Sequence, residues 1–140
     1  MTVGIHIIAD FYGVNSDILA RVEDMARIFE DTVKYAGVTK LAANYYQFEP
    51  FGCSGVVLLA ESHMSFHTWP EYGLVTLDFY TCGPPEQAHK AYEYLENVLK
   101  PKRVEYHKLV RGRAIHEEVP PKPIVGPLEV VDSREKVMGH

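Results

Sequence analysis

The sequence has no long hydrophobic run and no surplus of basic residues. No window approaches the roughly twenty consecutive apolar residues that a transmembrane helix needs. The N-terminal stretch lacks a basic region and carries Asp10 inside its apolar run, unlike a secretory signal. Lys and Arg number 14 against 19 Asp and Glu, so no basic stripe is available to neutralise phosphates. We therefore expect neither a membrane nor a nucleic-acid partner.

Cysteine is also scarce, since Cys53 and Cys82 are the only two in 140 residues. Two cysteines do not form a disulfide framework, so we expect thiols, either buried or reactive, in a cytoplasmic protein. Hydrophobic residues make up 46% of the chain and charged residues 24%, which indicates a folded chain rather than a disordered one. At this length the expectation is one domain, residues 1–140.

The hydrophobic patterns that are present predict an α+β fold. Strands are expected at residues 4–12, 39–48, 55–60, 74–81 and 103–111. Helices are expected from Asn15 or Ser16 to Gly37 and from Pro84-Pro85 to Pro101. Together these elements predict a two-layer sandwich, with two helices on one face of a largely antiparallel sheet.

Two segments carry further expectations. Residues 55–60, GVVLLA, form a continuous apolar run, which is typical of a strand buried on both faces. Residues 114–140 contain four prolines and mixed charge, so we expect a tail that runs over the surface and is mobile in part.

Reactive side chains are densest in residues 60–72, AESHMSFHTWPEY. His63 and His67 have the spacing of a zinc-binding pair on a helix, but the flanking residues indicate a strand and no third ligand is suitably spaced, so we expect no metal. Ser62 beside these histidines suggests a hydrolase nucleophile, yet the glycine-flanked elbow is absent, and Ser54 in GCSG lacks the rest of it too. A third interpretation is that the histidines are ordinary hydrogen-bonded strand residues.

Several runs at fixed spacing are more specific than these single features. ESH is followed by HTWPEYG and then by DFYTCG, all within residues 52–83. On these runs the sequence resembles the S-adenosylmethionine decarboxylase proenzyme family in its short prokaryotic form. The N-terminal GIHIIADFYG and the RGR at 111–113 are compatible with the same family. The resemblance implies an enzyme that cleaves itself and carries a pyruvoyl group, without pyridoxal phosphate.

By this resemblance, Ser62 becomes the cofactor. Its hydroxyl would attack the carbonyl of Glu61, and β-elimination and hydrolysis would leave a pyruvoyl group derived from Ser62. The chain would then consist of a β chain, 1–61, and an α chain, 62–140. The family pattern assigns help with processing to two residues, Ser54 and His67. An imidazole suits that task because it transfers protons near neutral pH.

The resemblance also implies the reaction. The pyruvoyl carbonyl would form a Schiff base with the amine of S-adenosylmethionine, and loss of CO2 would give the aminopropyl donor of spermidine synthesis. Cys82 matches the family's catalytic cysteine, which would protonate the former α-carbon. Phe48 matches a position that stacks on adenine, and Glu71 an acidic residue near the ribose or the sulfonium. Met64 would pack on the other side of the adenine.

Members of the family are dimers whose active sites draw on both protomers. A sheet with helices on one face leaves its other face in need of a partner, so we expect a homodimer with a four-layer αββα arrangement. Two alternatives stay open. Paralogous pyruvoyl enzymes decarboxylate arginine or ornithine, and a non-enzymatic α+β ligand-binding domain would keep the bond between residues 61 and 62 intact.

Overall fold

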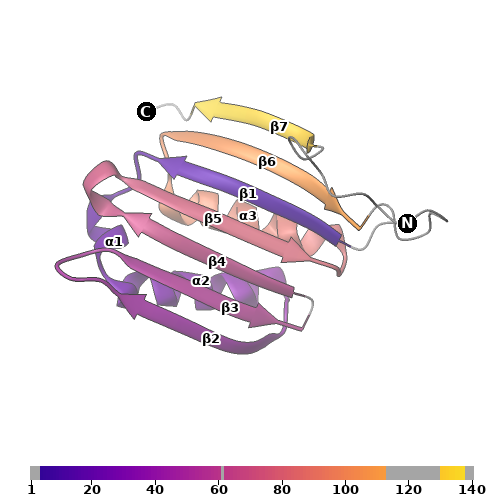
Figure 1. Ribbon diagram of the computed structural model, residues 1–140, viewed down its shortest axis with the longest axis horizontal. Coiled ribbons are helices and arrows are strands. Elements are labelled where there is room, and N and C mark those ends of the chain that lie inside the picture. Colours follow the sequence, from indigo (N-terminus) through magenta and orange to yellow (C-terminus); the bar gives the residue numbers. More distant parts are fainter. Residues whose placement is uncertain (1–3, 61, 113–129, 138–140) are drawn as a thin grey trace.

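The computed structural model describes residues 4–60, 62–112 and 130–137 (Figure 1). In chain order the elements are β1 (Gly4–Tyr12), α1 (Ser16–Ala20), α2 (Val22–Ala36), β2 (Lys40–Gln47), β3 (Cys53–Leu59), β4 (Ser62–Trp69), η1 (a 3-10 turn, Pro70–Tyr72), β5 (Leu74–Thr81), α3 (Pro85–Leu99), β6 (Arg103–Arg111) and β7 (Val130–Val137). Figure 1 shows the helices in one layer behind the sheet. None of the helices in this part of the chain is long and apolar enough to cross a membrane.

The strands form a single antiparallel sheet in the order β2-β3-β4-β5-β1-β6-β7. The N-terminal strand β1 therefore lies between β5 and β6, far from it in sequence. This architecture confirms the predicted α+β sandwich, with two differences. Residues 62–69, left out of the predicted strand order, form a central strand, and residues 130–137 of the expected tail pair with β6. The rest of that tail, 114–129 and 138–140, lies outside the described residues.

The single long helix predicted after residue 15 is wrong in one respect, because Arg21 has extended backbone (φ −117°, ψ 133°) and divides it. The Gln47 side chain supplies the hydrogen bonds that the helix loses there. Its Oε1 accepts from the backbone N–H of Val22 at 2.7 Å, and its Nε2 donates to the carbonyl of Ala20 at 2.9 Å. The other end is as predicted, since Gly37 closes α2 at φ 72°.

The core fills the space between the sheet and the helical layer. From α2 it takes Met25 and Phe29, and the Phe29 ring meets that of Phe66 on β4 with centroids 4.6 Å apart. Leu95 of α3 is fully buried in the same cluster. Burial of such side chains from water is the main favourable contribution to folding.

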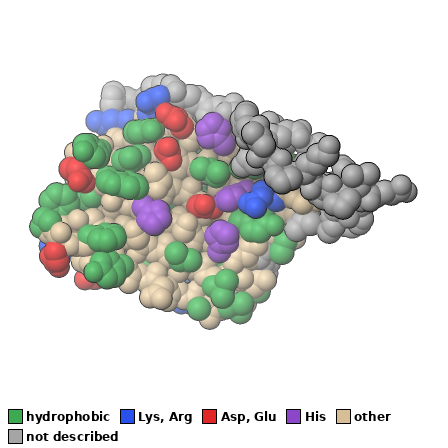
Figure 2. Space-filling view, viewed as in Figure 1, with side chains coloured by type: hydrophobic (Ala, Val, Ile, Leu, Met, Phe, Trp, Pro, Cys, Tyr) green, Lys and Arg blue, Asp and Glu red, His purple; other side chains and the backbone are tan. Residues whose placement is uncertain are grey.

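No helix of the described residues lies on the opposite face of the sheet, which is called the open face below. Along β3 the side chains alternate, with Val57 and Leu59 buried while Val56 and Leu58 are each 50% exposed. The prediction that residues 55–60 are buried on both faces is therefore wrong, because helices cover only one face. Figure 2 views the open face, where hydrophobic side chains and histidines lie side by side.

Candidate active site

One end of the open face holds a cleft of about 300 Å³. It brings together four of the residues that the sequence singled out, Phe48, Ser54, His67 and Glu71. Phe48 follows β2, Ser54 lies on β3, His67 on β4 and Glu71 on η1. The antiparallel pairing of β2, β3 and β4 brings these positions to the same end of the strands. A concave site with aromatic walls and a few polar groups is typical of small-molecule binding.

Ser54 and His67 form the polar floor of this cleft. They lie directly opposite each other in the β3–β4 ladder, and Ser54 Oγ is 2.6 Å from His67 Nδ1. The hydrogen bond fixes the orientation of the ring and leaves Nε2 as the second functional nitrogen. An imidazole held in this way can accept or donate a proton near neutral pH.

Aromatic side chains form the walls of the cleft. Phe48 is 47% exposed and Trp69 is 38% exposed, which is high for large apolar side chains on a folded chain. The ring of Trp69 lies 6.3 Å from that of His67, centroid to centroid. Trp69 had no predicted role, although it is the sole Trp of the sequence and belongs to the HTWPEYG run. Exposed aromatic faces are suited to stacking against a flat ring.

The other end of β4 holds Ser62 and Cys82, whose Oγ and Sγ atoms are 4.0 Å apart. Ser62 is the first residue of β4, and Cys82 is the exposed residue that follows β5. Cys53, by contrast with the exposed Cys82, is buried, and burial raises the pKa of the Cys53 thiol. The environment thus distinguishes the two thiols, and Cys53 is a core residue.

Ser62 and His67 do not meet within one chain. They lie five residues apart on the same extended strand, which separates their Cα atoms by about 16 Å at the usual rise per residue. Ser62 is opposite Thr81, whereas His67 is opposite Thr76. The predicted site residues therefore form two groups: Ser62 and Cys82 at one end of β4, and the cleft residues at the other.

The position of the Met64 side chain differs from the predicted one. Met64 is predicted to pack against the adenine, whereas its side chain points to the helical layer and is 1% exposed. Successive side chains on a strand point to opposite faces, so Met64 cannot lie on the same face as its neighbours His63 and Ser65. It belongs to the core.

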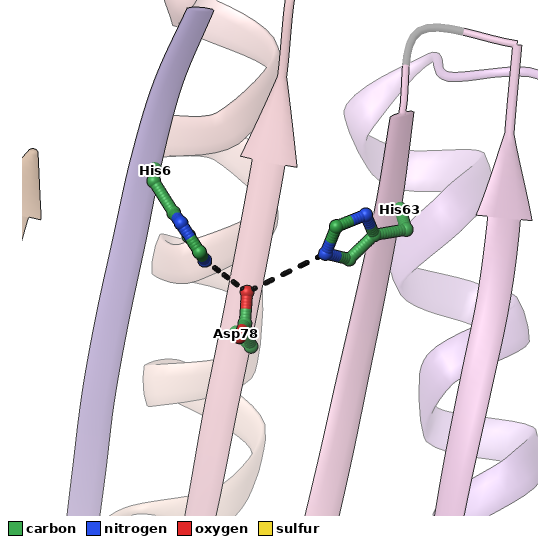
Figure 3. Close-up of side chains that lie close together, drawn as sticks. All are labelled: His6, His63 and Asp78. Carbon is green, nitrogen blue, oxygen red and sulfur yellow. Dashed lines mark hydrogen bonds and ion pairs between the residues drawn. The ribbon is translucent and has the colours of Figure 1, made fainter. Parts of the chain in front are cut away.

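The zinc alternative is also disfavoured by geometry. On a strand, four residues separate His63 from His67 by about 13 Å, too far to share one ion. Instead His63 lies close to His6 of β1 and Asp78 of β5, as Figure 3 shows. Local sequence patterns did not predict this cluster, because its three members come from three different strands.

Three comparisons relate the chain to known proteins. A family model described as S-adenosylmethionine decarboxylase matches residues 5–112. A Thermoplasma volcanium protein named S-adenosylmethionine decarboxylase proenzyme is 62% identical over 116 residues, which are 83% of this chain and 89% of that protein. The crystal structure of the adenosylmethionine decarboxylase from Aquifex aeolicus is 51% identical, covers 86% of this chain and 98% of its own, and superposes with a TM-score of 0.79.

A more distant structure shows the fold alone. The Trypanosoma brucei AdoMetDC-delta26 monomer is 17% identical, with a TM-score of 0.55 over 74% of this chain and 45% of that chain.

Proposed function

Since the chain belongs to the S-adenosylmethionine decarboxylase family, we propose that it removes the carboxyl group of S-adenosylmethionine by means of a pyruvoyl group made from Ser62. The product is the aminopropyl donor for spermidine synthesis. The observation that carries the proposal is the place of Ser62, at the first position of β4 with the Cys82 thiol 4.0 Å away. We expect the protein to act in the cytoplasm.

Self-cleavage begins with attack of Ser62 Oγ on the carbonyl carbon of Glu61. The peptide C–N bond breaks as the ester forms, and the nitrogen of residue 62 takes up a proton. Loss of the α-proton of residue 62 then breaks its Cβ–O bond and releases the Glu61 carboxylate. Water replaces the nitrogen, which leaves as ammonia, and the pyruvoyl group remains at the start of the α chain.

The position of the cut fits this chemistry. β4 begins at Ser62, so the cut falls directly before this strand and after Glu61, which lies outside the described residues. Strand β3 precedes the cut and β4 follows it. The two strands pair from Ser54 opposite His67 to Leu58 opposite His63. The β chain, 1–61, and the α chain, 62–140, therefore stay paired after cleavage.

The pyruvoyl group supplies an electron sink for the electron pair that remains when CO2 leaves the substrate. Cys82 donates a proton to the former α-carbon, and its contact with Ser62 supports that role. A thiol is suitable because its surroundings readily tune its pKa. Phe48 and Trp69 stack on the adenine, while Glu71 faces the ribose or the sulfonium cation.

A complete site requires two protomers. Ser54 and His67 assist processing, yet about 16 Å of strand separates them from Ser62 of their own chain. We therefore place Ser62 and Cys82 of one protomer against the cleft of its partner, in a homodimer whose open faces pack together as αββα. The exposed apolar side chains Tyr46, Val56 and Leu58 support this arrangement.

The test starts with intact mass and a denaturing gel. We expect the wild type to give fragments 1–61 and 62–140, the second blocked at its N-terminus, and Ser62→Ala to stay one chain. Ser65→Ala, a serine on the same strand, is the matched control and should cleave. Release of CO2 is then measured with S-adenosylmethionine, arginine and ornithine.

The outcomes separate the alternatives. An uncut, folded wild type would support the non-enzymatic ligand-binding domain. A cut wild type that decarboxylates arginine or ornithine, but not S-adenosylmethionine, would support the paralogous enzymes instead.

A further inference from the structure

Four strands contribute to a polar cluster on the open face that we call the Asp78 network: Arg111 of β6, His6 of β1, Asp78 of β5 and His63 of β4. Figure 3 shows His6 and His63 pointing at the Asp78 carboxylate from its two sides. His6 Nε2 is hydrogen-bonded to Asp78 Oδ1, and His63 Nε2 lies 3.8 Å from the same oxygen.

The hydrogen-bond donors in this network can be assigned. Arg111 Nη1 is 2.9 Å from His6 Nδ1, and a guanidinium has donors only, so Nδ1 accepts. The proton of a neutral His6 is then on Nε2, and this N–H donates to Asp78. A metal ion bound to Nε2 would have to displace that proton. Arg111, His6 and Asp78 therefore form a hydrogen-bonded chain, and His63 approaches the Asp78 end of it at 3.8 Å.

Tyr80 packs against the network from the side nearest Cys82. Its ring centroid is 5.6 Å from that of His6 and 5.8 Å from that of His63, and Arg111 Cζ lies 5.3 Å above it. His63 is opposite Tyr80 in the β4–β5 ladder, and Ser62 is opposite Thr81, the residue before Cys82. The Asp78 network thus contacts β4 at His63, one residue after Ser62.

Backbone pairing alone holds Ser62 weakly. On the β3 side the ladder ends at Leu58 opposite His63, so within the described part of the sheet residue 62 pairs with Thr81 of β5. In the uncut chain, residue 62 is also tethered by the preceding peptide bond. After the cut proposed above, it is a chain end attached only to His63, and chain ends fray unless they are tied down.

We propose that the Asp78 network is a positioning device that anchors the chain end created by self-cleavage. By fixing the His63 side chain, Asp78 holds the residue-62 pyruvoyl group beside Cys82. This inference rests on the proposed function and adds a role for residues that the processing chemistry does not use. The inference requires that loss of the network disturbs the position of residue 62 more after the cut than before it. Until the cut, the preceding peptide bond also tethers residue 62.

The test compares Asp78→Asn, His63→Phe and the double variant with the wild type. Asn keeps the shape of Asp78 but removes its charge, and Phe keeps a ring against Tyr80 without a nitrogen. Asp24→Asn is the matched control, since Asp24 is a surface carboxylate of α2 that pairs only locally with Arg27. The readouts are cleavage rate, amide hydrogen exchange of residues 63–66 in the cut protein, and kcat and KM for S-adenosylmethionine.

We expect Asp78→Asn to cleave at close to the wild-type rate. In the cut protein, exchange at residues 63–66 should rise about tenfold, because local opening becomes easier. Misplacement of the reacting group should lower kcat by about tenfold or more, with little change in KM. His63→Phe should reproduce this pattern, and the double variant should lose little more than either single one.

Wild-type exchange and kcat in Asp78→Asn would overturn the inference while leaving the proposed function intact. So would a cleavage rate that falls as much as kcat, or losses that add in the double variant. A wild type that never cleaves would overturn both proposals together. If Asp78→Asn does not fold, His63→Phe provides the same comparison.

Discussion

The Ser54 hydroxyl lies 2.6 Å from Nδ1 of His67, across the ladder that joins β3 to β4. This pair is well built for proton transfer, but Ser62, the residue proposed to react, is about 16 Å away on the same strand. Because Ser54 and His67 cannot reach the bond that is proposed to be cleaved in their own chain, they can assist cleavage only in another chain.

Dimers that combine two different variant chains test whether His67 of one chain assists cleavage of the other. His67→Ala alone should slow cleavage by about a hundredfold, the usual contribution of a general acid or base. Co-expression with Ser62→Ala should restore cleavage of the His67→Ala chain, because the intact imidazole of the partner then meets its Ser62. Mass spectrometry of the two differently tagged chains measures this rescue.

A chain carrying both substitutions is the control for that rescue. Mixed with His67→Ala, it offers no imidazole, so His67→Ala should stay uncut. Absence of rescue in the first mixture, with dimers present, would mean that His67 acts within its own chain or not at all.

The dimer interface is tested at Val56. The side chain is 50% exposed on the open face, and an aspartate there would place a charge inside the proposed contact between sheets. Burial of an uncompensated carboxylate is unfavourable by several kcal/mol, so Val56→Asp should weaken the dimer by about a hundredfold or more. Sedimentation velocity over a range of concentrations measures this.

Tyr35→Ser is the comparison for Val56→Asp. Tyr35 is also large, apolar and exposed (57%), but it lies on α2 in the helical layer. This variant should dimerise like the wild type. A Val56→Asp protein that stays dimeric would place the interface elsewhere.

Recognition of the adenine is tested at Phe48, which lines the cleft. Loss of a stacked aromatic ring typically reduces binding of a base by about 1–3 kcal/mol, so Phe48→Ala should raise KM for S-adenosylmethionine about tenfold or more. Phe48→Trp should retain near-normal KM because it restores a flat ring. Tyr72→Ala serves as a control, since Tyr72 is 73% exposed beside the cleft without lining it. Equal KM in Phe48→Ala and the wild type would exclude stacking at this position.

Asp10 is expected to destabilise the fold when it is ionised. Burial raises the pKa of its carboxyl, the nearby Glu105 raises it further, and His107 opposes them. A carboxyl with a raised pKa in the folded state binds its proton more tightly there, so stability falls as pH rises through the unfolded value, about 3.9. Asp10→Asn should therefore raise the melting temperature at neutral pH by about 1–2 °C, with no gain in acid.

Ionised Glu30 is expected to stabilise the fold, the opposite of ionised Asp10, so Glu30 is the control for the Asp10 experiment. Its hydrogen bond from Lys40, 2.7 Å long, is the main cause that lowers the pKa of its carboxyl, and Tyr45 donates a second. The resulting stabilisation is present above the unfolded pKa and is lost as pH falls. Glu30→Gln should lower the melting temperature at neutral pH by about 1–2 °C and converge with the wild type in acid. Two melting curves that shift in the same direction would contradict this account.

Local patterns were sufficient for most elements of the fold. Alternation along residues 4–12 and the apolar stripe that includes Met25 and Phe29 predicted the strand and helix observed there. The break at Arg21 was not predicted, because the group that replaces the lost helical hydrogen bonds is the side chain of Gln47, distant in sequence. Exposure of Val56 and Leu58 was not predicted either, since their composition does not say which face the helices cover.

For the site, the sequence by itself predicted the reactive residues, because the runs around Ser62 and Cys82 are contiguous and specific. Tertiary structure alone decided how those residues are distributed. Strand geometry places Ser62 and His67 at opposite ends of β4, although only five residues separate them. Sheet order brings His6 and Asp78, 72 residues apart, into one hydrogen bond. Spacing along a chain fixes distance only within an element, whereas contacts between elements depend on how the strands are ordered in the sheet.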